Sequence, residues 1–385
     1  AFTIPSYLGY FWEPLKTSPL FGTSVAMGIV AILILINIIG IRESTLLNLS
    51  LTVLDIGTQL LLVILALIFL FNPSVFVERI TSYWPSTLNL VFGIAIAAIA
   101  FTGLETVSQM AEETKRPQIR APRALILMTI AVLVIFGGIS VSAFSAMTPT
   151  EIATSWAEDP IAGIANALSI TIVPHEIASR WFSGLELQII SAWVLGAIRT
   201  LLPILVALLA ATILFIATNA GLMGISRLAF SLGRHQLIPP ALSRVHSHFK
   251  TPYTAIIVFG LVAILLQTPG YFMPDLFTNL GGLYAFGSML SFALAHASIL
   301  ALRVKQPDLS RPFKLGWNIR IRGYELPLTA LLGLIGMSAI WVVVVIMQPY
   351  SRWVGFGWMG VGFILYYLFR PKLSSRKLIK DIGQL

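Results

Sequence analysis

The sequence predicts an all-α integral membrane protein. Of its 385 residues, 57% are hydrophobic and 11% are charged, and the mean hydropathy is +0.88. A soluble domain carries about 25% charged residues, so a soluble protein is excluded. Apolar runs of about 20 residues, the length that crosses a bilayer as a helix, recur along nearly the whole chain. An outer-membrane barrel would instead show short segments of alternating polarity, so a helical bundle is favoured.

Nine membrane-spanning helices are predicted from these runs, which short polar, proline-rich or arginine-rich segments separate. Their approximate ranges are 20–39, 46–71, 87–111, 124–147, 201–221, 255–266, 276–302, 326–347 and 353–369. In the fifth span, Pro203 is a candidate kink and Asn219 a candidate for a hydrogen bond to a neighbouring helix.

A long segment, 148–200, lies between the fourth and fifth predicted spans and is rich in acids. Part of it, 183–198, is apolar enough to form a tenth span. It contains Glu186 and Gln188, however, and counting it as a span would invert every later loop. We therefore predict that this part forms a separate helix on the outer surface of the membrane.

The orientation follows from the excess of Lys and Arg in cytoplasmic loops. Of the 25 Lys and Arg residues, 20 lie in loops on one side, which we predict to be cytoplasmic. These loops are the turn at Arg42, 115–123, 227–250, 303–322 and the tail from Arg370. The C-terminus is then cytoplasmic and Ala1 lies outside. An odd number of further spans is expected upstream, because a chain that starts outside without a signal is unusual.

Several function classes are excluded by residues that the sequence lacks. It has no Cys, which removes disulfides, thiol nucleophiles and cysteine-bound metal. It has no HExxH or GxSxG pattern, so an enzyme is not expected, and neither is a metal site or a resident cofactor. The net charge of +9 lies in loops beside the spans, which indicates the lipid bilayer as a partner and not nucleic acid.

Three ionisable residues fall inside predicted spans, where a charge is costly and usually functional: Asp55, Glu105 and His296. Gly103 and Glu105 fit a broken helix whose free backbone groups hold the charged ends of an amino acid. They fit equally well a close helix contact with a structural acid. His296 is better interpreted as a hydrogen-bonded bundle residue than as a proton relay.

Asp55 shares a helical face with Thr52 and Gln59. This group either binds a proton or sodium, or is an interfacial acid that pairs with an Arg or caps a broken helix. After the third span, Glu112 and Glu113 are followed by Arg116 in a stretch (112–123) that two prolines stiffen, which predicts a hinge. The charges there either form a salt-bridged inner gate or act as a solvated topology signal.

Two motifs carry a resemblance to a known family. The first is Phe101-Thr102-Gly103-Leu104-Glu105, followed by Glu112-Glu113, Pro117 and Pro122-Arg123-Ala124. The second is Asn219-Ala220-Gly221, followed by ISRLAFSLGR (225–234) and Leu237-Ile238-Pro239. Both resemble segments of the amino acid/polyamine/organocation (APC) superfamily, around its sixth helix and after its eighth.

The resemblance implies a leucine-transporter-like fold of two inverted five-helix repeats. The nine spans resemble helices four to twelve, so the first repeat is incomplete. The chain is then a single transmembrane domain (1–385): 1–86 ends the first repeat, 87–310 is the second, and 311–385 holds two accessory helices and the tail. It also implies a substrate pocket formed by Ile99, Ala100, Phe101, Thr102, Gly103 and Glu105, with Phe101 as a lid.

The function implied is secondary active transport of an amino acid across the cell membrane by alternating access, as symport or antiport. Several relatives carry Lys where the spacing places Asp55, and there the amine is thought to replace sodium. An acid reverses this charge, so proton coupling and a sodium-like site both remain open. The alternatives are a transporter of polyamines or cationic amino acids, and a permease-like sensor or partner subunit that transports nothing.

Overall fold

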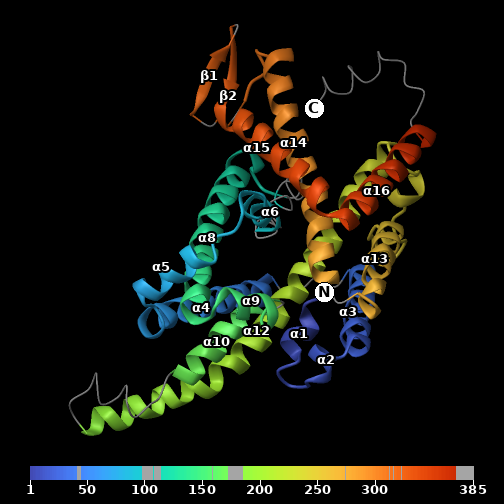
Figure 1. Ribbon diagram of the computed structural model, residues 1–385. Helices are drawn as coiled ribbons and strands as arrows, with labels where there is room; N and C mark the ends of the chain where they lie inside the picture. The colour runs from blue at the N-terminus through green and yellow to red at the C-terminus, as the bar shows by residue number, and fades with distance from the viewer. Residues whose placement is uncertain are drawn as a thin grey trace.

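The computed structural model describes residues 1–40, 45–97, 107, 114–157, 159–171, 185–273, 275–311, 313–314, 316–321 and 323–369. Helices dominate this part of the chain, as Figure 1 shows. In chain order the helices are α1 (Ile4–Leu8), α2 (Pro14–Thr17), α3 (Pro19–Ile39), α4 (Thr45–Phe69), α5 (Pro73–Ser82), α6 (Thr87–Ala97), α8 (Pro117–Ala146), α9 (Pro149–Thr154), α10 (Pro160–Thr171), α12 (Leu185–Arg234), α13 (Tyr253–Gln267), α14 (Leu276–Lys305), α15 (Leu328–Met347) and α16 (Pro349–Phe369). Two short 3-10 helices, η3 (Pro240–Ser243) and η4 (Thr268–Tyr271), complete the set.

Seven of the described helices are long and apolar enough to cross a membrane. They are α3, α8, α14 and α15, together with Thr52–Phe69 of α4, Thr200–Arg234 of α12 and Tyr253–Tyr271. Each corresponds to one of the nine spans expected from the sequence. The other two expected spans fall on α6, which is shorter in the described residues, and on α16, so nine spans remain a prediction.

The surface of these helices suits lipid. The most apolar stretch of 18 residues in α8 has a mean hydropathy of 2.7, yet only 6% of this stretch is buried inside the protein. Large apolar side chains such as Leu127, Leu133 and Val134 therefore lie exposed on α8. Such a surface is unfavourable in water but favourable against acyl chains. The chain is accordingly a multi-pass membrane protein.

The longest helix, α12, corrects one expectation. A separate surface helix was predicted for 183–198, but from Leu185 the chain runs without interruption to Arg234, through Pro203. At about 1.5 Å per residue the helix is roughly 75 Å long, more than twice the hydrocarbon thickness of about 30 Å. Its first part projects beyond the other helices (Figure 1). Because one continuous helix cannot turn back, this stretch adds no extra crossing.

The start of α8 corrects a second expectation. The residues 117–123 were predicted to form part of a hinge, but they are the first turns of α8. Pro117 occupies the start of the helix, where its missing N–H is not needed. Arg116, directly before it, has a φ of 54°, in the left-handed region. The predicted hinge can therefore extend no further than Arg116.

A β-hairpin between α14 and α15 was not predicted. Its strands are β1 (Asn318–Ile321) and β2 (Tyr324–Pro327), paired antiparallel with Ile321 opposite Tyr324. The two-residue turn ends at Gly323, whose φ of 86° favours glycine. The alternation of Ile319 and Ile321 before a glycine was the available signal. The expected all-α class thus holds for the membrane region but not for this loop.

The interior is divided into small apolar clusters, and α12 belongs to more than one. The largest joins α4, α8, α10 and α12, and a second joins α3, α12 and α13. A third lies between α6, α14 and α15. Leu202 and Val206 belong to the first cluster and Leu222 to the second. Consequently α12 packs in both groups of helices, which also meet at a fourth cluster around Ile4, Tyr7 and Ala211.

Two polar interactions also tie elements together. The Nδ2 of Asn37 on α3 donates to Oδ1 of Asn219 on α12 at 2.6 Å, and to the Leu33 carbonyl at 2.8 Å. Asn219 is therefore an interhelical hydrogen-bonding residue, as its position in the fifth span suggested. On α5, Arg79 donates from one nitrogen to the carbonyls of Phe144, Ser145 and Met147 at 2.7 to 3.1 Å. It thereby satisfies free carbonyls at the end of α8.

Helix α13 approaches α3 most closely at Gly260. A Cβ atom added there would overlap the side chain of Ile34. We expect Gly260→Ala to lower the free energy of unfolding by about 1–2 kcal/mol, because overpacking outweighs the better helix propensity of alanine. The check is thermal unfolding of the purified protein in detergent.

The matched control is Gly28→Ala on α3, where an added Cβ meets nothing within 4 Å and should be neutral or slightly stabilising. In an Ile34→Ala background the cost of Gly260→Ala should disappear. An equal loss in both backgrounds would contradict the assigned contact.

Candidate functional site

Most of the residues expected to form the substrate site lie outside the described part of the chain. These are Ile99, Ala100, Phe101, Thr102, Gly103 and Glu105, and the same holds for Glu112 and Glu113 of the expected inner gate. Helix α6 leads directly to this stretch and is described to Ala97. Arg116 is described: its side chain is exposed, and it forms no ion pair with the other described residues.

Asp55 lies in the third turn of α4 and faces the protein interior. Its exposed fraction is 7%. The Nε2 of Gln59, one turn later, donates to its Oδ2 at 2.7 Å. The Thr58 hydroxyl beside it donates to the Leu54 carbonyl at 2.9 Å. The sequence correctly placed Gln59 on the same face, and the structure adds the hydrogen bond.

A small cavity of about 40 Å³ opens at Asp55. Its lining is polar on the α4 side and apolar elsewhere, with Asp55, Thr58, Gln59 and Leu62 from α4, Ile161 from α10, and Val206, Leu209 and Ala210 from α12. A cavity needs about 10–15 Å³ to hold a water molecule, so this cavity can hold water or a small cation. No Lys or Arg lines this cavity or forms an ion pair with Asp55 among the described residues.

A larger cavity of about 600 Å³ lies beside the small one. Both cavities are lined by α10 and α12, through neighbouring residues of each helix. Ile161 and Val206 face the small cavity, whereas Ala162 and Ala207 face the large one. Its polar lining comes from several elements: Ser6, Tyr7, Tyr10, Lys16, Asp159, Asn166, Ser169 and Thr200. The volume lies within the range of small-molecule sites.

The wall of the large cavity contains an ion pair whose acid is buried. The Nζ of Lys16 lies 3.1 Å from Oδ2 and 3.3 Å from Oδ1 of Asp159, and 4.7 Å from the centre of the Trp156 ring. Asp159 is 3% exposed and directly precedes α10, where the helix dipole favours an acid. The pair ties α2 to the start of α10. The sequence analysis did not predict this pair, although an acid directly before Pro160, where a helix could begin, was a signal.

Tyr7 of α1 borders the same cavity and is also buried. Burial, together with the negative charges of Asp159 and Asp55, raises the pKa of Tyr7 above its usual range. The phenol therefore stays neutral and keeps its proton. It presents a hydroxyl group, and not a negative charge, to whatever occupies the cavity.

His296 on α14 makes a local contact. Its Nδ1 lies 2.6 Å from the Phe292 carbonyl, so this nitrogen carries the proton and donates it. The rest of the ring packs against Gly333 of α15, where a Cβ would overlap it. This arrangement fits a bundle residue between two helices. No group of three or more His, Cys, Asp or Glu that could hold a metal occurs in the described ranges.

Comparison with known proteins matches a family model described as "Amino acid permease" over residues 2–369. The branched-chain amino acid permease of Bacillus subtilis (strain 168) is 27% identical over 88% of this chain and 62% of its own length. The methylthioribose transporter of the same organism is 24% identical over 87% and 61%. The human cystine/glutamate transporter is 24% identical over 89% and 60%. The chain thus spans about three fifths of the length of these relatives.

Breaking the Lys16–Asp159 pair should have unequal effects. Lys16→Met leaves a buried carboxylate without its ammonium partner, whereas Asp159→Asn leaves a lysine that is 38% exposed and can turn to water. After a discount for that exposure, we expect Lys16→Met to cost about 1–2 kcal/mol and Asp159→Asn less. Thermal unfolding measures both, with the exposed Lys305→Met as control. A larger loss for Asp159→Asn would refute the assigned asymmetry.

Proposed function

The chain belongs to the amino acid permease family, whose model covers residues 2–369, and from this membership we propose that it moves an amino acid across a membrane as a secondary transporter. The extent of that match is the observation that carries the proposal. The seven described helices able to cross a bilayer support it, as does the naming of two of the relatives above for amino acid transport.

The proposed substrate site is the stretch Ile99 to Glu105, directly after α6. The support is chemical: Thr102-Gly103 interrupts an apolar run, and a helix broken there offers free N–H and C=O groups to the carboxylate and ammonium of an amino acid. Ile99, Ala100 and Phe101 supply apolar surface, which favours a substrate with an uncharged side chain.

The proposed mechanism is alternating access, in which α6 and α8 move against the helices packed on α12. The small buried share of the apolar stretch of α8 supports this, because a stretch that mostly faces lipid loses little packing when it moves. Glu112, Glu113 and Arg116 are proposed as the inner gate at the start of α8. In this arrangement the chain has nine spans, grouped as 1–86, 87–310 and 311–385, with a cytoplasmic C-terminus.

Uptake into proteoliposomes tests the transport function. We expect the full-length protein to accumulate a labelled amino acid with uncharged side chain in a saturable manner. Arginine and a polyamine are tested alongside, because preference for either would replace the proposed substrate class. The absence of saturable uptake for every compound would overturn the proposal in favour of a permease-like protein that does not transport.

Asp55 is proposed as the residue that couples transport to an ion. The support is its position: the carboxyl group is buried, it accepts a hydrogen bond from Gln59, and it borders a cavity large enough for a small cation. A buried carboxylate without a positive partner is unfavourable, so either a proton or a cation should neutralise it. Binding and release of that charge would link the site to an ion gradient.

Asp55→Asn keeps the shape of the side chain but removes its charge, so it should abolish the dependence of uptake on the pH or sodium gradient. The measurement is initial uptake rate against external pH and against sodium concentration. Asp275→Asn, which removes an exposed carboxylate at the start of α14, is the matched control and should keep both dependences. Unchanged profiles in Asp55→Asn would refute the role.

A further inference from the structure

A third cavity, of about 440 Å³, lies at the opposite end of α14 from Asp275. It is enclosed by the last turns of α14, the loop that follows and the start of α15. The lining has an apolar part (Ile299, Leu302, Leu309, Phe313, Pro327 and Ala330) and a basic part (Arg303, Arg311 and Lys314), and it also includes His296 and Thr329. Asp55, the coupling residue proposed above, does not line this cavity.

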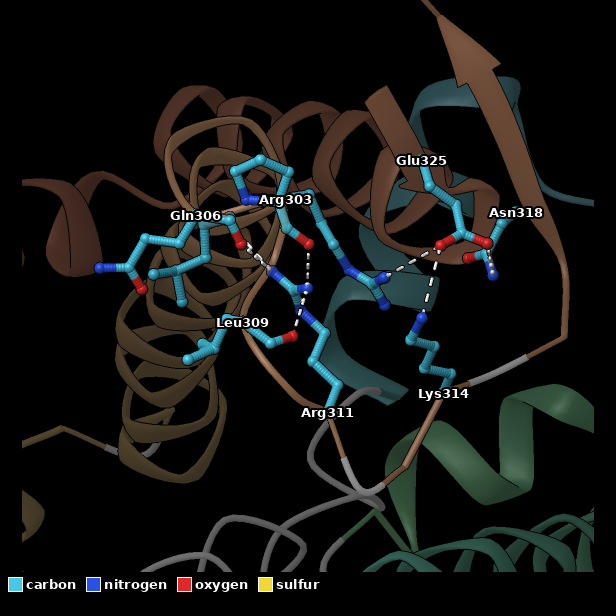
Figure 2. Close-up of polar contacts among 9 residues, drawn as sticks. Arg303, Gln306, Leu309, Arg311, Lys314, Asn318 and Glu325 are labelled. Atoms are coloured by element: carbon cyan, nitrogen blue, oxygen red, sulfur yellow. Dashed lines mark hydrogen bonds and ion pairs between the residues drawn. The ribbon is translucent and has the colours of Figure 1, made fainter. Parts of the chain in front are cut away.

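Hydrogen bonds from Arg311 organise the loop at the basic part of the cavity. The guanidinium of Arg311 donates to the carbonyls of Leu302, Gln306, Pro307 and Leu309 at 2.6 to 3.3 Å. These bonds satisfy free carbonyls at the end of α14 and fold the loop back over the helix. Figure 2 shows Arg311 pointing at these carbonyls while Arg303 and Lys314 point at Glu325 of β2. Arg311 is therefore a structural residue that holds the loop against the end of α14.

Arg303 and Lys314 are only loosely held by Glu325. The distances are 3.8 Å from Nη1 of Arg303 and 3.6 Å from Nζ of Lys314, both longer than the roughly 2.7–2.9 Å of a strong charged hydrogen bond. A single carboxylate thus faces two cations. Lys314 is also 47% exposed, so it can reach a ligand at the mouth of the cavity.

The surrounding segment has a strong excess of positive charge. Between positions 303 and 325 the sequence holds six Lys and Arg residues and two acids. An anion is therefore attracted to this end of the protein, and each basic residue near an anionic membrane surface contributes to such attraction.

The cavity lies where α14 ends and α15 begins. Both helices are long and apolar enough to cross a bilayer, so these ends are expected near a membrane surface. Ile299, Leu302, Leu309 and Phe313 are exposed, and Trp317 in the loop after α14 is 72% exposed. Tryptophan is typical of the membrane–water interface. The cavity therefore combines an apolar surface with cations at the end of two spans.

We propose that this cavity binds an anionic phospholipid of the adjacent leaflet, with its phosphate between Arg303 and Lys314 and the first part of an acyl chain along Ile299, Leu302 and Leu309. The opposite chemical halves of a phospholipid match the two halves of the lining. A zwitterionic lipid fits the apolar wall equally well but brings no net negative charge to the two cations.

The test uses the purified full chain in detergent, titrated with dioleoyl phosphatidylglycerol and followed by native mass spectrometry and by melting temperature. Dioleoyl phosphatidylcholine provides the same acyl chains without net charge, and inorganic phosphate provides the anion without the chains. We expect retention of phosphatidylglycerol, a rise in melting temperature with this lipid, and neither effect with phosphatidylcholine or phosphate at the same concentration.

Lys314→Gln is the main variant, because its exposed side chain is not needed for folding. It should weaken phosphatidylglycerol binding about fivefold, as expected for one basic residue near an anionic headgroup. Lys305→Gln, with the same change of charge on an exposed side chain that does not line the cavity, is the matched control and should change binding less than twofold. Leu309→Gln keeps every charge and should also weaken binding, because it makes the apolar wall polar.

Three results would overturn the proposal. Equal binding by the wild type and Lys314→Gln would show that Lys314 does not contact the lipid. Equal binding of phosphatidylcholine and phosphatidylglycerol would show an apolar surface without selection for charge. Equal effects of inorganic phosphate and the lipid would show a free-anion site. Because none of these measurements involves uptake, they are independent of the proposed transport function.

Discussion

Close contact between helices is the constraint on which the remaining structure depends. In a bilayer the lipid offers a helix the same apolar contacts as a neighbouring helix does, so association relies on shape and on polar bonds. At Gly260, α13 comes near enough to α3 that Ile34 fills the space of a missing side chain. One turn of α12 adds the Asn37–Asn219 bond to the same group. The buried clusters are small because they rest on such contacts and not on a large common core.

Polar groups can lie inside this structure because the packing around α12 encloses them. Asp55 on α4 is covered by α10 and α12, beside the apolar cluster that joins these helices. The Lys16–Asp159 pair lies beside the neighbouring cavity, where a lysine that is partly exposed holds a buried acid. Among the described residues, one carboxylate therefore has a fixed cation and the other has none. That difference distinguishes a structural acid from one able to exchange a proton or an ion.

The sequence predicted what depends on local composition. Apolar runs located the seven described helices that can cross a membrane, and Asn219 was identified from a polar group in an apolar stretch. It could not predict that α12 is continuous through 185–199, because Glu186 and Gln188 are unfavourable in lipid but not in a helix that extends beyond it. Nor could it predict the Lys16–Asp159 pair, whose members are 143 residues apart. The expected substrate residues, 99–105, lie outside the described ranges and remain a prediction.

The basic loop after α14 shows that charges which set orientation also have local structural roles. Orientation depends only on how many Lys and Arg residues lie near the ends of the spans. Arg311, however, donates to four carbonyls, and in doing so it closes the end of α14 and holds the following loop beside a cavity. A glutamine at position 311 would lower the loop charge by one unit, as at Lys305, yet it would also release these carbonyls. The two residues are equivalent for topology but not for structure, so the position of each charge carries information that the count does not.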